Sequence, residues 1–127
     1  MLTGRAENYL HGRADLADTI ARLQAYQAAG ADVLYAPGLR GLDDIATLVR
    51  NVDRPVNVLM GLTGLRLSVD DLARVGVKRI SVGGAFARAA FGGFLKAARE
   101  VRDKGTFDFN DAATPFAELN GLFSAEK

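Results

Sequence analysis

The sequence predicts an α/β fold in which four parallel strands alternate with helices. Four short runs rich in β-branched residues start roughly every 23 to 30 residues, over 1–5, 32–36, 55–60 and 78–83. Stretches with helical periodicity separate these runs, which is the pattern of a parallel sheet covered by helices. A closed barrel of eight such units takes about 250 residues. The 127 residues therefore predict half of a (β/α)8 barrel of the TIM type.

The first two helices are predicted from apolar stripes and from the residues that begin or end them. Asp15 is a good N-cap, and Leu16, Ile20 and Leu23 follow it at helical spacing. Gly30 then ends this first helix, because glycine adopts the left-handed conformation that a helix end commonly needs. The second helix carries a similar stripe, which consists of Leu42, Ile45, Leu48 and Val49.

The second half of the chain repeats this arrangement. Pro55 begins the third strand, where a missing N–H costs little, and a loop is expected over residues 61–67. Ser68 and Asp71 form the pattern of a capping box at the start of a short helix. A long helix follows the fourth strand and ends at Gly105. Its expected apolar face consists of Phe86, Ala90, Phe94, Ala97 and Val101.

A final helix is predicted over about residues 114–124, with Thr114 as N-cap and Pro115 at the first helical position. Its apolar residues recur at helical spacing and are Phe116, Leu119, Leu122 and Phe123. The chain has no low-complexity stretch or linker, so a single domain over residues 1–127 is expected.

Composition excludes several classes of function. The net charge of +1 gives no electrostatic reason to expect nucleic acid or an anionic membrane as partner. The absence of cysteine excludes disulfides, a thiolate nucleophile and a zinc knuckle. No apolar run reaches membrane-spanning length, and the first residues do not form a signal peptide, so a cytoplasmic location is expected.

Four segments together resemble the isocitrate lyase and phosphoenolpyruvate mutase superfamily. They are Arg-Ala-Glu-Asn at 5–8, the run ending Tyr-Ala-Pro-Gly-Leu over 28–39, Pro-Val-Asn-Val-Leu at 55–59 and the run over 76–83. The resemblance places the chain on strands five to eight of the family barrel. It implies Mg²⁺-dependent chemistry that makes or breaks C–C or P–C bonds in small keto or hydroxy carboxylates. It also implies a homo-oligomer in which the last helix exchanges onto a neighbouring subunit.

The resemblance also suggests which residues form the site. Arg5 matches the arginine that binds the substrate carboxylate, and it ends a strand, where barrel active sites are built. Asn57 matches a substrate-binding asparagine, and Glu7 matches an acidic residue that orients the arginine or a nearby loop. Tyr35 ends the second strand and could line the pocket floor. Structural roles in packing or on the surface explain Arg5, Asn57, Glu7 and Tyr35 as well.

The metal ligands of the family belong to its strands two to four, and no comparable acidic cluster occurs in this sequence. Acidic residues here fall mostly on helix surfaces or caps. Mg²⁺ prefers octahedral coordination by carboxylate and water oxygens. We therefore expect Mg²⁺ for the family but no metal ligands in this chain, and no catalysis by the chain alone.

Other residues have simpler explanations. His11 is expected in a surface turn, because no nucleophile pattern surrounds it. Ser81 and the glycine pair at 83–84 end the last strand. A glycine pair before a helix can bind an anion through backbone N–H groups, although an ordinary turn explains it equally.

Three functions remain open on this sequence. The chain is the carboxyl half of a lyase-type barrel whose other half is supplied elsewhere, or it is a non-catalytic half-barrel or gene remnant that covers its bare sheet by self-association. A flavodoxin-like binding module is the third, but it requires a phosphate loop after the first strand, and residues 5–8 do not form one.

Overall fold

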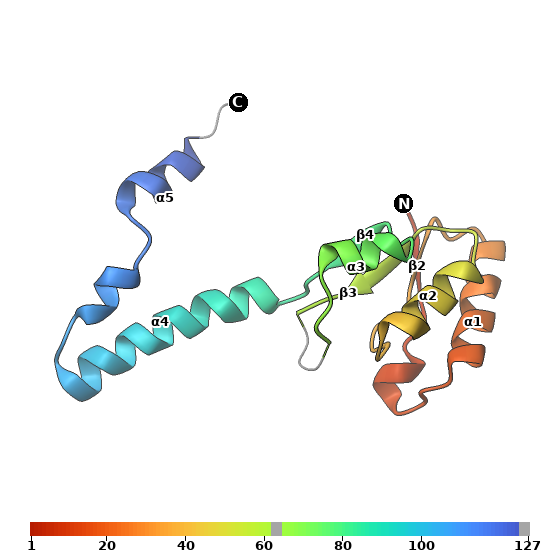
Figure 1. Ribbon diagram of the computed structural model, residues 1–127, viewed down its shortest axis with the longest axis horizontal. Coiled ribbons are helices and arrows are strands. Elements are labelled where there is room, and N and C mark those ends of the chain that lie inside the picture. The colour runs from red at the N-terminus through yellow and green to blue at the C-terminus, as the bar shows by residue number, and fades with distance from the viewer. Residues whose placement is uncertain (62–64, 125–127) are drawn as a thin grey trace. The chain divides into compact units, whose positions relative to one another are not determined.

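The computed structural model describes residues 1–61 and 65–124. Residues 62–64, which belong to the loop predicted over 61–67, lie outside the described part, as do residues 125–127. The chain divides into two compact units, Met1–Ala85 and Phe86–Lys127. Figure 1 shows both units and labels most of their helices and strands.

The first unit contains a four-stranded parallel sheet in the order β1-β2-β3-β4. The strands are β1 (Thr3–Arg5), β2 (Val33–Tyr35), β3 (Val56–Leu59) and β4 (Arg79–Ser81). Each strand therefore pairs with the strand that follows it in sequence, as in successive βα units of a barrel. The prediction of four parallel strands with helices is confirmed, and each strand is shorter than the run that predicted it.

Three α-helices connect these strands, namely α1 (Leu16–Ala28), α2 (Leu42–Arg50) and α3 (Val69–Arg74). Asp15 is the N-cap of α1, as predicted: its carboxylate accepts a hydrogen bond of 3.0 Å from the backbone N–H of Asp18. This bond satisfies one of the N–H groups that have no partner within the helix.

The capping box of α3 is also confirmed. The Ser68 hydroxyl accepts a hydrogen bond of 3.0 Å from the Asp71 N–H, and the Asp71 carboxylate accepts one of 2.9 Å from the Ser68 N–H. Hydrogen bonds from the Ser68 backbone and hydroxyl lower the pKa of Asp71. A short 3-10 helix, η1 (Asn8–His11), follows β1; the sequence had suggested only a turn in this region.

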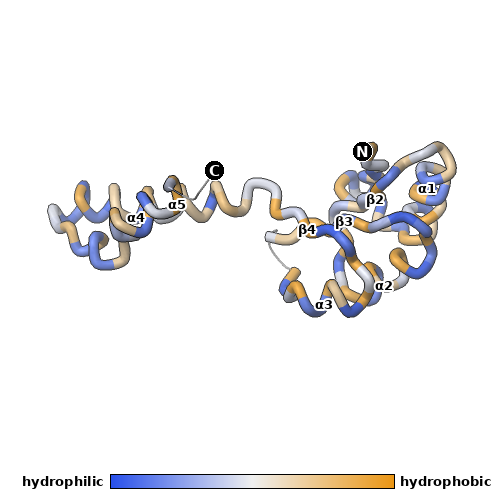
Figure 2. Tube along the Cα trace, turned by 90° about the horizontal axis from the view of Figure 1, so that it is seen from above, coloured by the Kyte–Doolittle hydropathy of each residue, from blue (hydrophilic) through white to orange (hydrophobic). Residues whose placement is uncertain are grey.

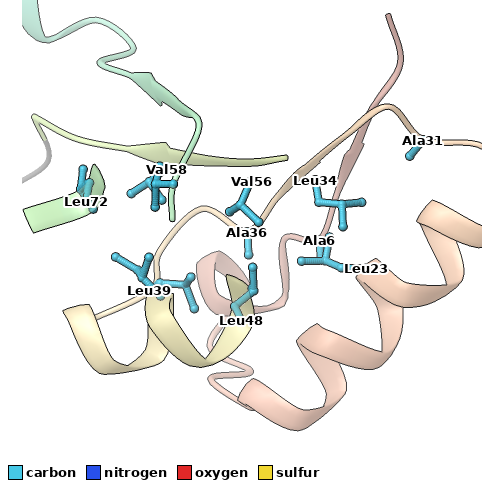
Figure 3. Packing of buried hydrophobic residues seen from close by; sticks show 12 residues of the cluster. Ala6, Leu23, Ala31, Leu34, Ala36, Leu39, Leu48, Val56, Val58 and Leu72 are labelled. Carbon is cyan, nitrogen blue, oxygen red and sulfur yellow. The ribbon is translucent and has the colours of Figure 1, made fainter. Parts of the chain in front are cut away.

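One face of the sheet packs against the helices and forms the core. Alternate strand residues point to opposite faces, and Leu34, Val56 and Val58 point toward Leu23 of α1 and Leu48 of α2 in Figure 3. All five are buried. The fit is close at β1 as well. A Cβ atom on Gly4 would lie 2.9 Å from the Cβ of Tyr26, so only glycine lets β1 approach α1 this closely.

The opposite face of the sheet carries most of its polar side chains, and we call it the polar face. It is defined by the strand residues that alternate with those of the core, which are Thr3, Arg5, Val33, Tyr35, Asn57, Leu59, Arg79 and Ser81. In a closed barrel this face is the interior surface. Its polar character therefore indicates a site and not a second apolar core.

The second unit consists of helical segments. It contains most of α4 (Ala85–Lys104), followed by η2 (Asp108–Ala112) and α5 (Phe116–Phe123). Apolar and hydrophilic residues alternate along α4 in Figure 2. The final helix is present, but the predicted cap is wrong: Pro115, not Thr114, is the N-cap, because its ψ of 144° is extended and helical geometry begins at Phe116. Within the described part of the chain, no helix has the length and apolarity that a membrane span requires.

The turn from α4 to η2 is organised by Glu100. Its carboxylate accepts hydrogen bonds from the Thr106 hydroxyl at 2.9 Å, the Asp108 N–H at 2.6 Å and the Phe109 N–H at 3.4 Å. Burial acts to raise the pKa of Glu100, but these three donors and the charge of Lys104 together outweigh burial, and the pKa is lowered. One ionised side chain therefore holds the start of η2 against the end of α4.

Candidate functional site

Four side chains of the polar face form one row across the sheet. The strand register pairs Arg5 with Tyr35, Tyr35 with Asn57, and Asn57 with Arg79. Laterally paired residues of parallel strands point to the same face and lie about 4.8 Å apart. The structure thus brings together three of the four residues that the sequence singled out, and Glu7 joins them through Arg5.

Arg5 ends β1 and is held by two neighbours. Its Nε donates a hydrogen bond to the Glu7 carboxylate, and its guanidinium lies 4.9 Å from the centre of the Tyr35 ring. An ion pair and a cation–π contact together fix the plane of the guanidinium. Among the described residues, the terminal nitrogens of Arg5 have no hydrogen-bond partner, so the two-pronged end of the side chain is available to a carboxylate.

Asn57 is the most buried polar residue of this face, with 2 % of its surface exposed. Its Nδ2 donates a hydrogen bond of 3.0 Å to the Ser81 hydroxyl, whereas its Oδ1 has no partner among the described residues. A buried amide oxygen without a donor is unusual, and leaving it so costs about 1–3 kcal/mol. This atom is therefore the clearest unmet hydrogen-bonding requirement in the row.

Glu7 also faces a second basic group. Its other oxygen lies 3.7 Å from Nε2 of His11, which ends η1 and is largely exposed. A surface pocket of about 400 Å³ next to this pair is lined by Glu7, Asn8, His11, Arg13 and Arg22. The position of His11 at the surface agrees with the sequence-based interpretation.

Asn8 and Tyr9 of η1 have roles in packing. The Asn8 amide donates a hydrogen bond of 2.6 Å to the Thr19 hydroxyl, and this ties η1 to the first turn of α1. Burial raises the pKa of Tyr9, and the carboxylates of Asp44 and Asp15 raise it further. These contacts hold the loop that leads away from Arg5.

Two residues of the polar face next to Asn57 were not assigned to the site from the sequence. Arg79 was not singled out, and Ser81 was considered only with the glycine pair that follows it. Ile80 between them packs on the core, so strand alternation places Arg79 and Ser81 on the polar face. The same alternation around Asn57 could have identified both residues once β4 was recognised as a strand.

The residues present do not fit a metal site. Over residues 1–61 and 65–124, no group of three or more His, Asp or Glu side chains is placed so that it could hold a metal ion. The carboxylate of Glu7, which contacts the row through Arg5, is already engaged by Arg5 and His11. The described residues therefore offer a carboxylate-binding arginine and an amide, but not the carboxylates that Mg²⁺ prefers.

Comparisons of the sequence and of the structure with known proteins agree with each other. The phosphoenolpyruvate phosphomutase family matches residues 1–102. An uncharacterised protein of Mycobacterium tuberculosis is 35% identical over 119 residues, which cover 93% of this chain and 44% of the relative. The phosphoenolpyruvate phosphomutase of Streptomyces hygroscopicus is 30% identical over 112 residues, covering 86% of this chain and 36% of that enzyme.

Solved structures share the fold. A candidate lyase/mutase from Burkholderia cenocepacia superposes with a TM-score of 0.92 at 62% identity, over 99% of this chain and 45% of that protein. An oxaloacetate acetylhydrolase in complex with 3,3-difluorooxalacetate superposes with a TM-score of 0.76 at 24% identity, over 95% of this chain and 42% of that chain. This chain spans less than half the length of these relatives. It belongs to the phosphoenolpyruvate mutase/isocitrate lyase superfamily.

Proposed function

We propose that this chain provides the carboxylate-binding part of a lyase or mutase site that acts on small keto or hydroxy carboxylates. The observation that supports this most directly is the row on the polar face, where Arg5, Tyr35 and Asn57 lie side by side on adjacent strands. Active sites of barrels are built at the carboxyl ends of the strands, and both Arg5 and Tyr35 end their strands.

Each residue has a distinct role in this proposal. Arg5 binds the substrate carboxylate with its terminal nitrogens, in the two-pronged geometry that arginine favours. Glu7 and Tyr35 hold the guanidinium through the ion pair and the cation–π contact. Asn57 supplies the amide that hydrogen-bonds a second polar group of the substrate.

Mg²⁺, the metal expected for the family, would be bound by residues other than those described here. We propose that these ligands come from a further part of the barrel, which another segment or another polypeptide supplies. The absence of a suitable group among the described side chains supports this division, as does the share of each relative that the chain covers. The chain by itself is then expected to bind a carboxylate but not to turn it over.

The proposal is tested by titrating oxalate into the 127-residue chain and measuring binding by calorimetry. Arg5→Gln removes the charge and the two-pronged contact and is expected to weaken binding about tenfold or more, because hydrogen bonds to charged groups are worth about 1.5–3 kcal/mol. Arg54→Gln is the matched control, since Arg54 is exposed and precedes the amino end of β3, whereas Arg5 lies at the carboxyl end of β1. Equal oxalate affinity for the two variants would contradict the role of Arg5.

Self-association without catalysis is the second candidate. Within residues 1–61 and 65–124, the edge strands β1 and β4 each pair with one neighbour, and large apolar side chains of the helical unit are exposed, among them Phe86, Phe116 and Phe123. Bare edges and apolar surface favour pairing between copies. In this proposal α5 exchanges onto a neighbouring subunit, and the chain forms a homo-oligomer whether or not it binds a carboxylate.

Molar mass in solution separates the two candidates. Light scattering during gel filtration is expected to give a dimer or larger species, and Phe116→Ala combined with Phe123→Ala is expected to shift it toward monomer. Phe107→Ala serves as control, because Phe107 is also exposed but precedes α5. A monomer at micromolar concentration would exclude self-association, and an oligomer that does not bind oxalate would favour the non-catalytic candidate.

A further inference from the structure

The surface pocket next to Glu7 gathers basic side chains from three segments of the chain. It has a volume of about 400 Å³ and is lined by Glu7, Asn8, His11, Arg13 and Arg22. His11 ends η1, Arg13 lies in the loop that follows, and Arg22 belongs to α1. The volume lies within the range of pockets that bind small molecules, which is about 300–1,000 Å³.

The turn between His11 and Arg13 is fixed by the backbone. Gly12 has a φ of 75°, in the left-handed region that favours glycine, and its N–H donates to the Asn8 carbonyl oxygen. The N–H of Arg13 donates to the same oxygen at 2.9 Å. The Asn8 side chain is 7 % exposed and is tied to α1 by its hydrogen bond to Thr19. The turn and the buried part of the lining are therefore held in place by the chain itself.

The charges that line this pocket are unequally matched. Glu7 faces Arg5 with one carboxylate oxygen and His11 with the other. Arg22 uses its Nε for an ion pair within α1, at 2.7 Å, so its terminal nitrogens are not used by that pair. The Arg13 guanidinium has no ion-pair or hydrogen-bond partner in the described part of the chain. A ligand that matches the charge of Arg13 must be an anion.

We propose that this pocket binds the phosphate group of a small phosphate ester, at a site separate from the one proposed for the carboxylate. A guanidinium can donate two hydrogen bonds at once to phosphate oxygens. Donors from three segments suit a tetrahedral anion better than a planar carboxylate, because the oxygens of a tetrahedral anion point in several directions. His11 lies 3.7 Å from Glu7, which is beyond hydrogen-bond length, so its exposed imidazole can turn toward the anion.

NMR of His11 tests the proposal, because this residue is the single histidine of the sequence and its imidazole signals need no further assignment. Glycerol 3-phosphate, titrated into the full chain at constant pH and ionic strength, is expected to shift these signals along a saturable curve. Arg13→Gln removes the unmatched charge and is expected to raise the midpoint of the curve about tenfold or more. Arg54→Gln, at an exposed position outside the pocket, is the matched control and is expected to leave the midpoint unchanged.

Malonate, a dianion with planar carboxylates, tests the preference for phosphate. We expect no shift of the His11 signals that depends on Arg13 when malonate is titrated. Malonate binding that depends on Arg13 and is as tight as that of the ester would overturn this preference. A linear response to glycerol 3-phosphate, or equal midpoints in Arg13→Gln and Arg54→Gln, would overturn the site itself. Since the inference does not rest on Arg5, failure of oxalate binding would leave it standing.

Discussion

The two units of the chain differ in how much of their apolar surface they bury. In Met1–Ala85, side chains from strands and helices form a continuous core, and Leu34 and Ile45 are completely buried. In the described part of Phe86–Lys127, the helices contain no buried residue. Phe94 of α4 is 64% exposed and Phe123 of α5 is 89% exposed.

The difference shows that an amphipathic pattern forms a core only when a second element covers it. Fully burying a leucine is worth about 1.5–3 kcal/mol, and the first unit gains this many times from its own residues. The second unit is held by local interactions, such as the bonds to Glu100. Its apolar face is therefore available to a partner, in agreement with the self-association proposed above.

The largest expected contrast between the units comes from truncating an apolar side chain in each. Leu34→Ala leaves a cavity at the centre of the sheet and is expected to lower the free energy of unfolding by about 2–5 kcal/mol. Phe94→Ala, at an exposed position, is expected to change it by less than about 0.5 kcal/mol. Urea denaturation followed by circular dichroism at low protein concentration measures both. A comparable loss in the two variants would show that Phe94 is covered in solution.

Glycine substitutions are expected to have opposite signs in the two units. In Gly4→Ala the new Cβ would meet Tyr26 at 2.9 Å, and overpacking of this kind costs about 1–3 kcal/mol. In Gly92→Ala, within α4, a Cβ would meet nothing within 4 Å, so the substitution is expected to stabilise the helix by about 0.5–1 kcal/mol. Thermal unfolding of the two variants measures the difference. Destabilisation by Gly92→Ala would indicate that this helix face is in close contact with a partner.

The smallest expected effect is the loss of local stability when two carboxylates, those of Asp71 and Glu100, are protonated at low pH. The pKa values of Asp71 and Glu100 are both lowered in the folded chain. Each group therefore stabilises its turn above the ordinary carboxyl pKa, and the contribution is lost as the pH falls through the lowered value. NMR titration is expected to show the Asp108 amide signal moving with protonation of Glu100. Glu100→Gln should abolish this movement, whereas the control Asp71→Asn should leave it in place. Movement of the Asp108 signal that persists in Glu100→Gln would mean that Glu100 does not hold η2.

Much of the local structure could be predicted from the sequence. The N-cap Asp15 and the capping box at Ser68 were identified correctly, because both depend on residues within one turn of a helix. The order and parallel direction of the four strands were also predicted. The N-cap of α5 was placed one residue too early, since proline fits both the cap and the first helical position in sequence.

The candidate site could be predicted only in part. Arg5, Glu7 and Asn57 were singled out by resemblance to a family, and Tyr35 by its place at a strand end. Their contacts depend on strand register, which no single segment encodes. The hydrogen bond from Asn57 to Ser81 joins residues that are 24 positions apart. Neither its existence nor the lack of a partner for Oδ1 of Asn57 among the residues that the structure describes follows from either residue alone.

The sequence by itself determined which segments form helices and strands and two of the helix caps, because caps, glycines and periodicity act over a few neighbouring residues. It also determined the family. Only the tertiary structure decided which polar side chains share a face and which apolar side chains remain uncovered. The physical reason is that strand register and burial depend on packing between segments that are distant in sequence. This packing stabilises the chain only once the whole sheet has assembled.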